Sequence, residues 1–191
     1  KRIYDNDMGP NTGGMGSYSP TPLSSDDLIN KTCDRIISPI LRSMKDAGHP
    51  YIGFLYVGLM ILNGEPYVIE FNVRMGDPET QVVIPLLKNS LYDLLTAAIN
   101  QKLNTFDIEI SSKYAVCIVL ASNGYPKTYN TGEIIEGLDL LDDNLVFHAG
   151  TKYYKGKYIT NGGRVLNIIW FGETLYAAIE NAYGNIDKIK F

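Results

Sequence analysis

Residues 51–73 read YIGFLYVGLMILNGEPYVIEFNV, and this stretch decides the fold of the first half of the chain. Two runs of strand-forming residues, Tyr51–Leu62 and Glu65–Val73, flank the dipeptide Asn63-Gly64. Asn-Gly between such runs is typical of a two-residue type I′ turn, because both central residues of that turn need a positive φ. The pattern therefore predicts an antiparallel hairpin.

Two polar residues, Glu70 and Asn72, stand two positions apart on the second strand, so their side chains share one face. Counting back from the turn, the register sets Glu70 opposite Val57 and Asn72 opposite Leu55. A carboxylate and an amide oxygen on one face can share a hard cation such as Mg²⁺, which takes few protein ligands beside phosphate oxygens. A half-exposed strand would carry the same two residues, and the bare Glu-x-Asn pattern favours that structural interpretation.

The loop that follows, residues 74–81, favours a phosphate site. Arg74 continues the face of the polar pair if the strand extends that far, and a metal with a guanidinium would grip a polyphosphate. Asp77 and Glu79 are also common turn and helix-cap residues, and for Asp77 the two interpretations carry equal weight.

A second glycine-rich segment, Gly9–Gly16, holds four glycines and a proline in eight positions, which predicts a loop and no helix or paired strand. Its backbone N–H groups could cradle an anion. No Gly-Lys-Ser/Thr follows, so it is not a Walker loop. A tight structural turn is the alternative.

The remaining pattern changes at the polar residues 104–113, which predict a boundary. A helix is expected over about 26–47, capped by Ser24 or Ser25, kinked at Pro39 and ended by Gly48. Further helices are expected over about 90–103 and from about 173. Strands are expected at 114–121, 132–138, 146–149, 158–160 and 164–171.

Composition excludes several functional classes. With 17 Lys and Arg against 21 Asp and Glu the formal net charge is −4, which argues against nucleic acid and anionic membranes as partners. Two cysteines build no disulfide framework, and no apolar run reaches the ~18 residues of a membrane span. We expect a cytoplasmic protein. Because the chain opens on Lys1 rather than Met, we also expect it to be a piece of a longer protein.

Taken together, five segments resemble one family, the phosphoribosylamine–glycine ligases (glycinamide ribonucleotide synthetases) of the ATP-grasp superfamily. They are Gly9–Gly16 with Tyr18-Ser19-Pro20, Gly53–Tyr56, Glu70–Gln81, Phe147–Thr151 and Thr160–Val165. The resemblance implies an α+β fold. Residues 1–105 would form the C-terminal half of an ATP-grasp domain, an antiparallel sheet with helices, and residues 106–191 a smaller, mostly antiparallel α+β domain.

The resemblance also implies a reaction and its participants. ATP, glycine and 5-phosphoribosylamine would give glycinamide ribonucleotide, ADP and phosphate through a glycyl phosphate, the second step of purine synthesis. The partners would be these small molecules, with neither nucleic acid nor membrane, and the protein is expected to be a monomer. Catalysis would be mostly positioning and charge neutralisation, which suits a site without a nucleophile.

Roles carried over from the family fall on the motifs above. Glu70 and Asn72 match ligands of Mg²⁺ or Mn²⁺, and Arg74 is expected near the transferred phosphate as a catalytic group. A wider set is expected to line the glycine and phosphoribosylamine pocket: Asp7, Asn11, Thr12, Gly13, Gly14, Asp77, Pro78 and Glu79. No residue is assigned to adenine. Many ATP-grasp enzymes carry a further metal carboxylate about where Gly58 stands here.

Two other hypotheses remain. As a piece lacking the nucleotide clamp, the chain could be catalytically inert and act only as a structural or interaction module, and alone it is expected to be inactive. A different ATP-grasp ligase, such as a carboxylase, would leave the Gly9–Gly16 and Gly76–Gln81 loops unexplained.

Overall fold

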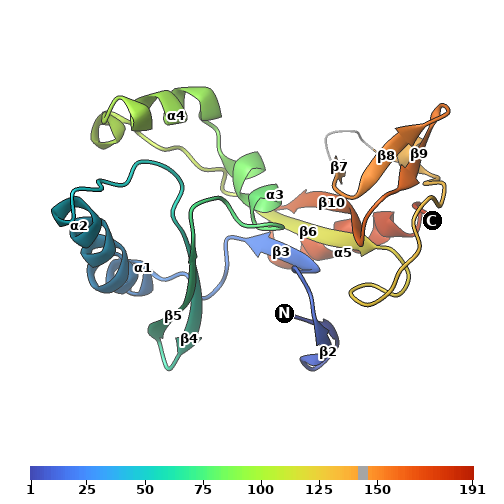
Figure 1. The fold of residues 1–191 in the computed structure, drawn as a ribbon, viewed down its shortest axis with the longest axis horizontal. Coiled ribbons are helices and arrows are strands. Elements are labelled where there is room, and N and C mark those ends of the chain that lie inside the picture. Colours follow the sequence, from blue (N-terminus) through green and yellow to red (C-terminus); the bar gives the residue numbers. More distant parts are fainter. Residues whose placement is uncertain (142–145) are drawn as a thin grey trace. The chain divides into compact units, whose positions relative to one another are not determined.

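The computed structural model describes residues 1–141 and 146–191, and it has the α+β architecture that the sequence predicts (Figure 1). Its contacts group into two compact units. The first unit contains Lys1–Ser19, Asp77–Lys88 and Ile110–Phe191, and the second contains Pro20–Gly76 and Asn89–Glu109. The chain thus passes between the units several times, because each is built from segments distant in sequence. The division at residue 105 into two family domains stays a prediction.

A four-stranded antiparallel sheet forms the centre of the first unit. Its strand order is β3-β6-β10-β7, with β3 at Gly16–Ser19, β6 at Tyr114–Ala121, β10 at Arg164–Gly172 and β7 at Val146–His148. The two central strands are near-continuous apolar runs, which is what a sheet covered on both faces requires. The predictions for β6, β7 and β10 are confirmed to within a residue.

Helices cover both faces of this sheet. On one face α5 (Leu175–Ile186), capped by Thr174, packs Ala178 and Ala182 against Val116. On the other face α3 (Thr80–Val83) and the 3₁₀ turn η2 (Ile84–Leu86) supply buried Val82 and Leu86, which pack against Cys117. Val116 and Cys117 are adjacent on β6 and so point to opposite faces.

The glycine-rich N-terminal region pairs more than the sequence predicts. Strand β1 (Arg2–Tyr4) pairs with β2 (Met8–Asn11), and β3 pairs with β6. The expectation of an unpaired loop was wrong because glycine here permits close strand approach. A Cβ at Gly16 would lie 2.7 Å from the carbonyl oxygen of Cys117.

A separate hairpin and an irregular segment complete the first unit. Strands β8 (Thr151–Tyr154) and β9 (Lys157–Thr160) join at the Lys155-Gly156 turn. The strand expected at 132–138 is wrong, since single bridges at Ile134 and Glu136 replace it. Glycines with φ of +93° and +84°, at 132 and 137, interrupt the extended backbone, and the 3₁₀ turn η4 (Leu138–Leu140) follows.

The second unit opens with the predicted helix. It comprises α1 (Asp26–Thr32), the π-helical turn η1 (Cys33–Ile37) and α2 (Ser38–Asp46). Ser25 caps it by accepting a hydrogen bond from the Leu28 N–H, and Gly48 with φ +84° follows its end. The widened turn directly precedes Pro39, which lacks an N–H for the helical ladder.

The decisive hairpin lies in the same unit as β4 (Tyr56–Leu62) and β5 (Glu65–Asn72), joined at Asn63-Gly64 (Figure 1). Asn63 has φ +53° and Gly64 has φ +77°, as the type I′ prediction requires. The unit also holds α4 (Leu91–Ile99), capped by Ser90, and the 3₁₀ turn η3 (Leu103–Thr105). Within the described ranges, no helix is long and apolar enough to cross a membrane.

Candidate functional site

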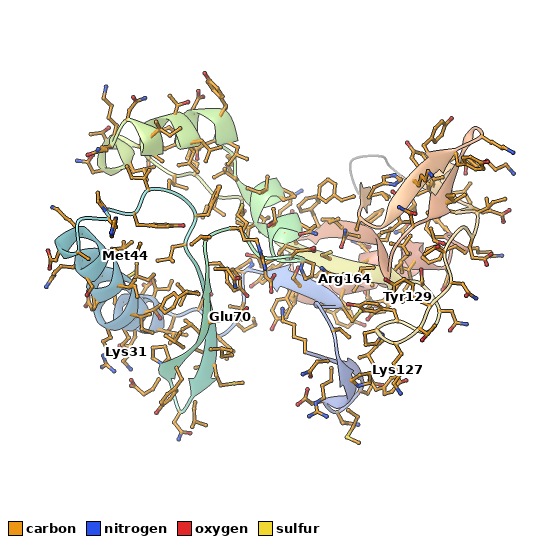
Figure 2. The ribbon with its side chains drawn as sticks, viewed as in Figure 1. Lys31, Met44, Glu70, Lys127, Tyr129 and Arg164 are labelled. Atoms are coloured by element: carbon orange, nitrogen blue, oxygen red, sulfur yellow. The ribbon has the colours of Figure 1, made fainter. Side chains whose placement is uncertain are left out.

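The candidate residues form two groups, one in each compact unit. In the second unit, Glu70 and Asn72 lie near the end of β5, and Figure 2 labels Glu70 there. The register places Glu70 opposite Gly58 and Asn72 opposite Tyr56. The predicted partners, Val57 and Leu55, were therefore each wrong by one position.

The cause of this difference is a β-bulge. Leu59 pairs with Val68 and Gly58 with Glu70, so Ile69 is an extra residue on β5. Beyond the bulge the backbone resumes its alternation, so Glu70 and Asn72 keep a common face. Bulges re-aim side chains, and this one sits directly beside the candidate metal ligand.

Gly58 leaves space for the Glu70 carboxylate. A Cβ at this position would lie 3.1 Å from Cγ of Glu70, tighter than most real contacts. Among the described residues no group of three His, Cys, Asp or Glu side chains could enclose a metal ion. The pair Glu70 and Asn72 is thus a two-oxygen donor set, which fits a hard cation that takes its other ligands from water and phosphate.

Arg74 lies just beyond β5 in the second unit. Its Nη1 donates to the carbonyl oxygen of Met75 at 2.9 Å, and the residue is exposed. Its role at a transferred phosphate stays a prediction.

In the first unit, the glycine-rich loop and residues 77–81 are brought together by Arg164 at the start of β10 (Figure 2). Its Nη1 donates to the carbonyl oxygens of Gly13 at 3.0 Å and Asp77 at 3.1 Å, with a longer contact of 3.4 Å to Gly14. The guanidinium also forks onto the Asp77 carboxylate, with Nη2 at 2.8 Å from Oδ2 and Nη1 at 3.3 Å from Oδ1. One side chain therefore binds two segments that lie 87 and 151 residues before it in the chain.

Backbone contacts tighten the same junction. Gly14 has φ +106°, and a Cβ there would lie 2.7 Å from Cδ of Pro78, a fully buried residue joined to Asp77 by a cis peptide bond. Ser17 donates its hydroxyl to the Pro78 carbonyl at 2.7 Å. The Gly13 N–H donates to the Tyr125 hydroxyl at 3.0 Å.

The other predicted substrate residues lie around this junction. The Thr12 hydroxyl accepts from the Gly14 N–H and donates to the Lys1 carbonyl, while Glu79 forms an ion pair with Lys1. Asn11 ends β2 opposite Arg2. Asp7 lies in the turn between β1 and β2 with φ +55° and takes no part in the Arg164 contacts.

Gln81 was not predicted as a site residue, yet its amide is oriented by Asp77. Its Nε2 donates to Asp77 Oδ1 at 2.9 Å. An ionised carboxylate can only accept, so the amide must present its NH₂ group to Asp77 and its oxygen to the other side. Its Oε1 is buried and has no partner in the part of the chain that the structure describes. A buried acceptor without a partner needs a donor from elsewhere, and a ligand or water can supply it.

The charge of Asp77 also affects the pKa of a buried thiol, Cys117 on β6. Burial, reinforced by the negative charge of Asp77, raises the pKa of the Cys117 thiol to about 12, and a hydrogen bond with Ser17 opposes this. Cys117 is therefore a protonated core residue, as its place on an apolar strand predicts.

Sequence reasoning missed the role of Arg164 and Tyr125. Arg164 ends the turn Asn161-Gly162-Gly163-Arg164, and an arginine at the end of such a turn can face solvent or a ligand. The structure gives a third outcome, because its terminal nitrogens bind protein acceptors on two distant loops. The glycines of this turn are the sequence signal of close packing against Tyr125, because a Cβ at Gly163 would lie 2.3 Å from its ring.

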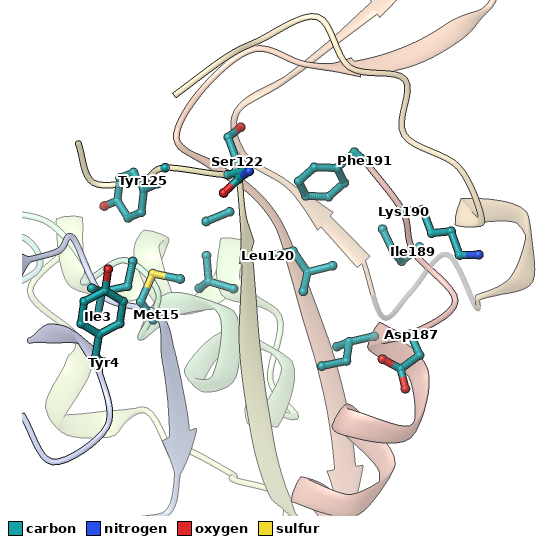
Figure 3. Close-up of a pocket in the computed structure, with 15 residues that line it drawn as sticks. Ile3, Tyr4, Met15, Leu120, Ser122, Tyr125, Asp187, Ile189, Lys190 and Phe191 are labelled. Carbon is teal, nitrogen blue, oxygen red and sulfur yellow. The ribbon is translucent and has the colours of Figure 1, made fainter. Parts of the chain in front are cut away.

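An open cavity of about 770 Å³ lies elsewhere in the first unit (Figure 3). The end of β6, the loop after it and the last residues of the chain line it, and Tyr4, Met15 and Tyr125 face it. None of the predicted site residues lines this cavity. The candidate site is therefore defined by the converging loops and not by this cavity.

Comparison with known protein families places the chain in the ATP-grasp class. A model of the ATP-grasp (A) domain of phosphoribosylglycinamide synthetase matches residues 1–80, which contain β5 and the glycine-rich loop. A model of the C domain of the same enzyme matches residues 115–191. The chain belongs to the phosphoribosylglycinamide synthetase family.

Whole-chain similarity supports this assignment. The chain is 47% identical over 194 residues to the phosphoribosylamine–glycine ligase of Neisseria meningitidis and 43% identical over 191 residues to that of Caldanaerobacter subterraneus. Each alignment covers 100% of this chain and 46% of the relative. The crystal structure of the Thermotoga maritima ligase superposes with a TM-score of 0.83 at 38% identity, over 100% of this chain and 47% of that one. The chain thus spans about half the length of the relatives it matches.

Proposed function

We propose that the protein containing this chain ligates glycine to 5-phosphoribosylamine with ATP, forming glycinamide ribonucleotide, ADP and phosphate. The observation that supports this most is the convergence of the Gly13–Gly14 turn and Asp77 on Arg164, since both motifs carry the resemblance to the ligases. We further propose that it works in the cytoplasm as a monomer and acts on small molecules alone.

The chemistry proceeds in two transfers. The glycine carboxylate attacks the γ-phosphorus of ATP, the bond to the β,γ-bridging oxygen breaks, and ADP leaves with the electron pair. The amine of phosphoribosylamine then attacks the acyl carbon of glycyl phosphate, releases inorganic phosphate and loses a proton. Positioning and neutralisation of charge carry such reactions, since no protein nucleophile takes part.

Each group of residues would contribute separately to this reaction. Glu70 and Asn72 would hold Mg²⁺ or Mn²⁺, and Gly58 keeps the space beside the Glu70 carboxylate open. A metal held there would supply positive charge that offsets the negative charge of the phosphates. Arg74 would donate hydrogen bonds to the transferred phosphoryl group, because a planar guanidinium can bind two phosphate oxygens at once.

The first-unit loops would bind glycine and phosphoribosylamine. The Asn11–Gly14 segment would line the pocket through its side chains and backbone, although the N–H groups of Thr12, Gly13 and Gly14 already donate within the chain. The Asp77 and Glu79 carboxylates would accept hydrogen bonds from substrate amines or hydroxyls. The buried acceptor Oε1 of Gln81, which has no partner among the described residues, adds a further position for a substrate donor.

The test is an assay of the complete protein that contains this chain. ADP release is measured with glycine and phosphoribosylamine present, then with each omitted in turn. Glu70→Ala should lower turnover by at least the ~100-fold that loss of an outer-shell metal partner can cause, because a direct ligand is removed. Glu109→Ala, an exposed carboxylate of the same unit, is the matched control and should keep full turnover. Normal turnover by Glu70→Ala would contradict the metal assignment.

A second measurement separates catalysis from the inert-module alternative. Calorimetric titration of the 191-residue chain with ATP and Mg²⁺ reports whether this part alone binds nucleotide. Saturable binding that Glu70→Ala weakens would argue against an inert module. Heat that does not depend on Glu70 would leave this part without a nucleotide role and favour the module.

A further inference from the structure

Arg164 is the most connected charged side chain of the first unit's loops, and the proposed reaction gives it no task. It comes from the C-domain strand β10, whereas its partners Gly13 and Asp77 lie in segments far earlier in the chain. Its Nη1 and Nη2 both donate to protein acceptors. These bonds direct the guanidinium toward the loops themselves.

The local sequence is fitted to this arrangement. A Cβ at Gly13 would lie 3.0 Å from Cζ of Arg164, so glycine lets the guanidinium pack flat against the turn. The Arg164 side chain is 22% exposed, while the Asp77 side chain is 50% exposed. The arginine is thus the sheltered partner, and Asp77 keeps part of its carboxylate open to solvent.

The Arg164–Asp77 pair also fixes a second side chain. Asp77 Oδ1 accepts from both Arg164 Nη1 and Gln81 Nε2, which leaves Gln81 Oε1 as a buried acceptor without a partner among the described residues. An aspartate held at only one oxygen could rotate, and the Gln81 amide would then lose its orientation. The bidentate fork removes that freedom because its two bonds lie in one plane.

We propose that Arg164 is a positioning residue for the ligation: it holds Asp77 and the Gly13–Gly14 turn in the geometry that the substrates require, without contacting them. This proposal rests on the proposed function. Binding of a substrate anion would need a positive charge alone, which lysine also supplies. A fork onto carboxylate and carbonyl oxygens needs the planar guanidinium, which lysine lacks.

The experiment compares three variants of the complete protein: Arg164→Lys, Arg164→Ala, and the control Arg42→Ala on the exposed side of α2. Steady-state kinetics are measured for each of the three substrates, together with the unfolding temperature. Arg164→Ala should lose about 100-fold in kcat, the size of effect that a misplacement of 1 Å can produce. The KM for ATP should stay unchanged, because the acceptors that Arg164 contacts are Gly13, Gly14 and Asp77 and not the proposed metal and phosphate residues.

Arg164→Lys and chemical rescue of Arg164→Ala distinguish a positioning role from a simple positive charge. Arg164→Lys should be nearly as impaired as Arg164→Ala, and low concentrations of guanidinium ion should restore part of the activity of Arg164→Ala while methylammonium should not. Full activity in Arg164→Lys would overturn the proposal in favour of a simple charge. A lower unfolding temperature with unchanged kcat would overturn it in favour of a merely structural role. Failure of the unmodified protein to make glycinamide ribonucleotide would instead contradict the proposed function.

Discussion

The close approach of Gly14 to Pro78 gives the sharpest prediction about how the substrate loops are built. Gly14→Ala adds one methyl group at φ +106°, 2.7 Å from Cδ of a proline that is fully buried and cannot retreat. The left-handed backbone costs an alanine about 1–2 kcal/mol. The overlap with Pro78 adds about 1–3 kcal/mol, the usual cost of overpacking a filled site.

Gly132→Ala is a matched control in the same unit. Its φ is +93°, and no atom lies within 4 Å of the position a Cβ would take. The difference between the two variants therefore isolates the contact with Pro78 from the backbone strain. For a chain of this size, a difference of about 1–3 kcal/mol corresponds to an unfolding temperature about 2–12 °C lower for Gly14→Ala.

The assay is thermal and urea unfolding of both variants of the 191-residue chain, followed by circular dichroism. In the complete protein, Gly14→Ala should also reduce kcat/KM for glycine, because movement of Pro78 displaces Asp77 from Arg164. Equal destabilisation by the two variants, with normal kinetics in Gly14→Ala, would refute this account of the loop junction.

Two further predictions concern buried polar atoms. The pKa of Cys117 is raised from 9.0 to about 12, so between these values the folded state keeps a proton that the unfolded state has lost. The stabilisation is therefore fully present below pH 9, and the free energy of unfolding should fall by up to about 1.4 kcal/mol per pH unit above it. In urea unfolding at pH 8 to 10.5, Cys117→Ala should lack this slope and Cys33→Ala should keep it. Gln81→Met removes a buried acceptor that has no partner among the described residues, and it also removes the hydrogen bond from Nε2 to Asp77. These two effects oppose each other, so the free energy of unfolding should change by less than about 1 kcal/mol. The same variant should raise the KM for glycine or phosphoribosylamine, and an unchanged KM for both would show that Oε1 meets no substrate.

The elements that the sequence predicts well are those with purely local causes. The Asn63-Gly64 turn requires positive φ at two adjacent residues, and only a few residue pairs adopt it readily. The helix cap at Ser25 is likewise local, since its hydroxyl satisfies the N–H three residues ahead. Such features can be read directly from neighbouring residues.

The register of the β4–β5 hairpin shows where local reading fails. Counting by two from the turn assumes an uninterrupted ladder, and the extra residue Ile69 shifts every later pair by one. Ile69 has a strand-forming side chain, so nothing in its identity marks the bulge. The shared face of Glu70 and Asn72 was predictable because alternation resumes after the bulge.

The substrate loops show a different limit. Each predicted residue of the Asn11–Gly14 and Asp77–Glu79 segments lies in a recognisable motif, yet the residue that joins them is Arg164, 87 positions beyond Asp77. Contacts of that range leave no spacing pattern in a single sequence. Strand β3 was missed for a similar reason, because its partner β6 lies about a hundred residues later.

The central claim is that glycine is activated by phosphorylation of its carboxylate. The most direct measurement supplies the complete protein with glycine carrying ¹⁸O in both carboxylate oxygens, together with ATP and phosphoribosylamine, and analyses the released phosphate by mass spectrometry. The account predicts one ¹⁸O atom in each phosphate, because the carboxylate oxygen that attacks phosphorus leaves with it when the amine displaces phosphate. Unlabelled phosphate accompanying the formation of product would contradict it.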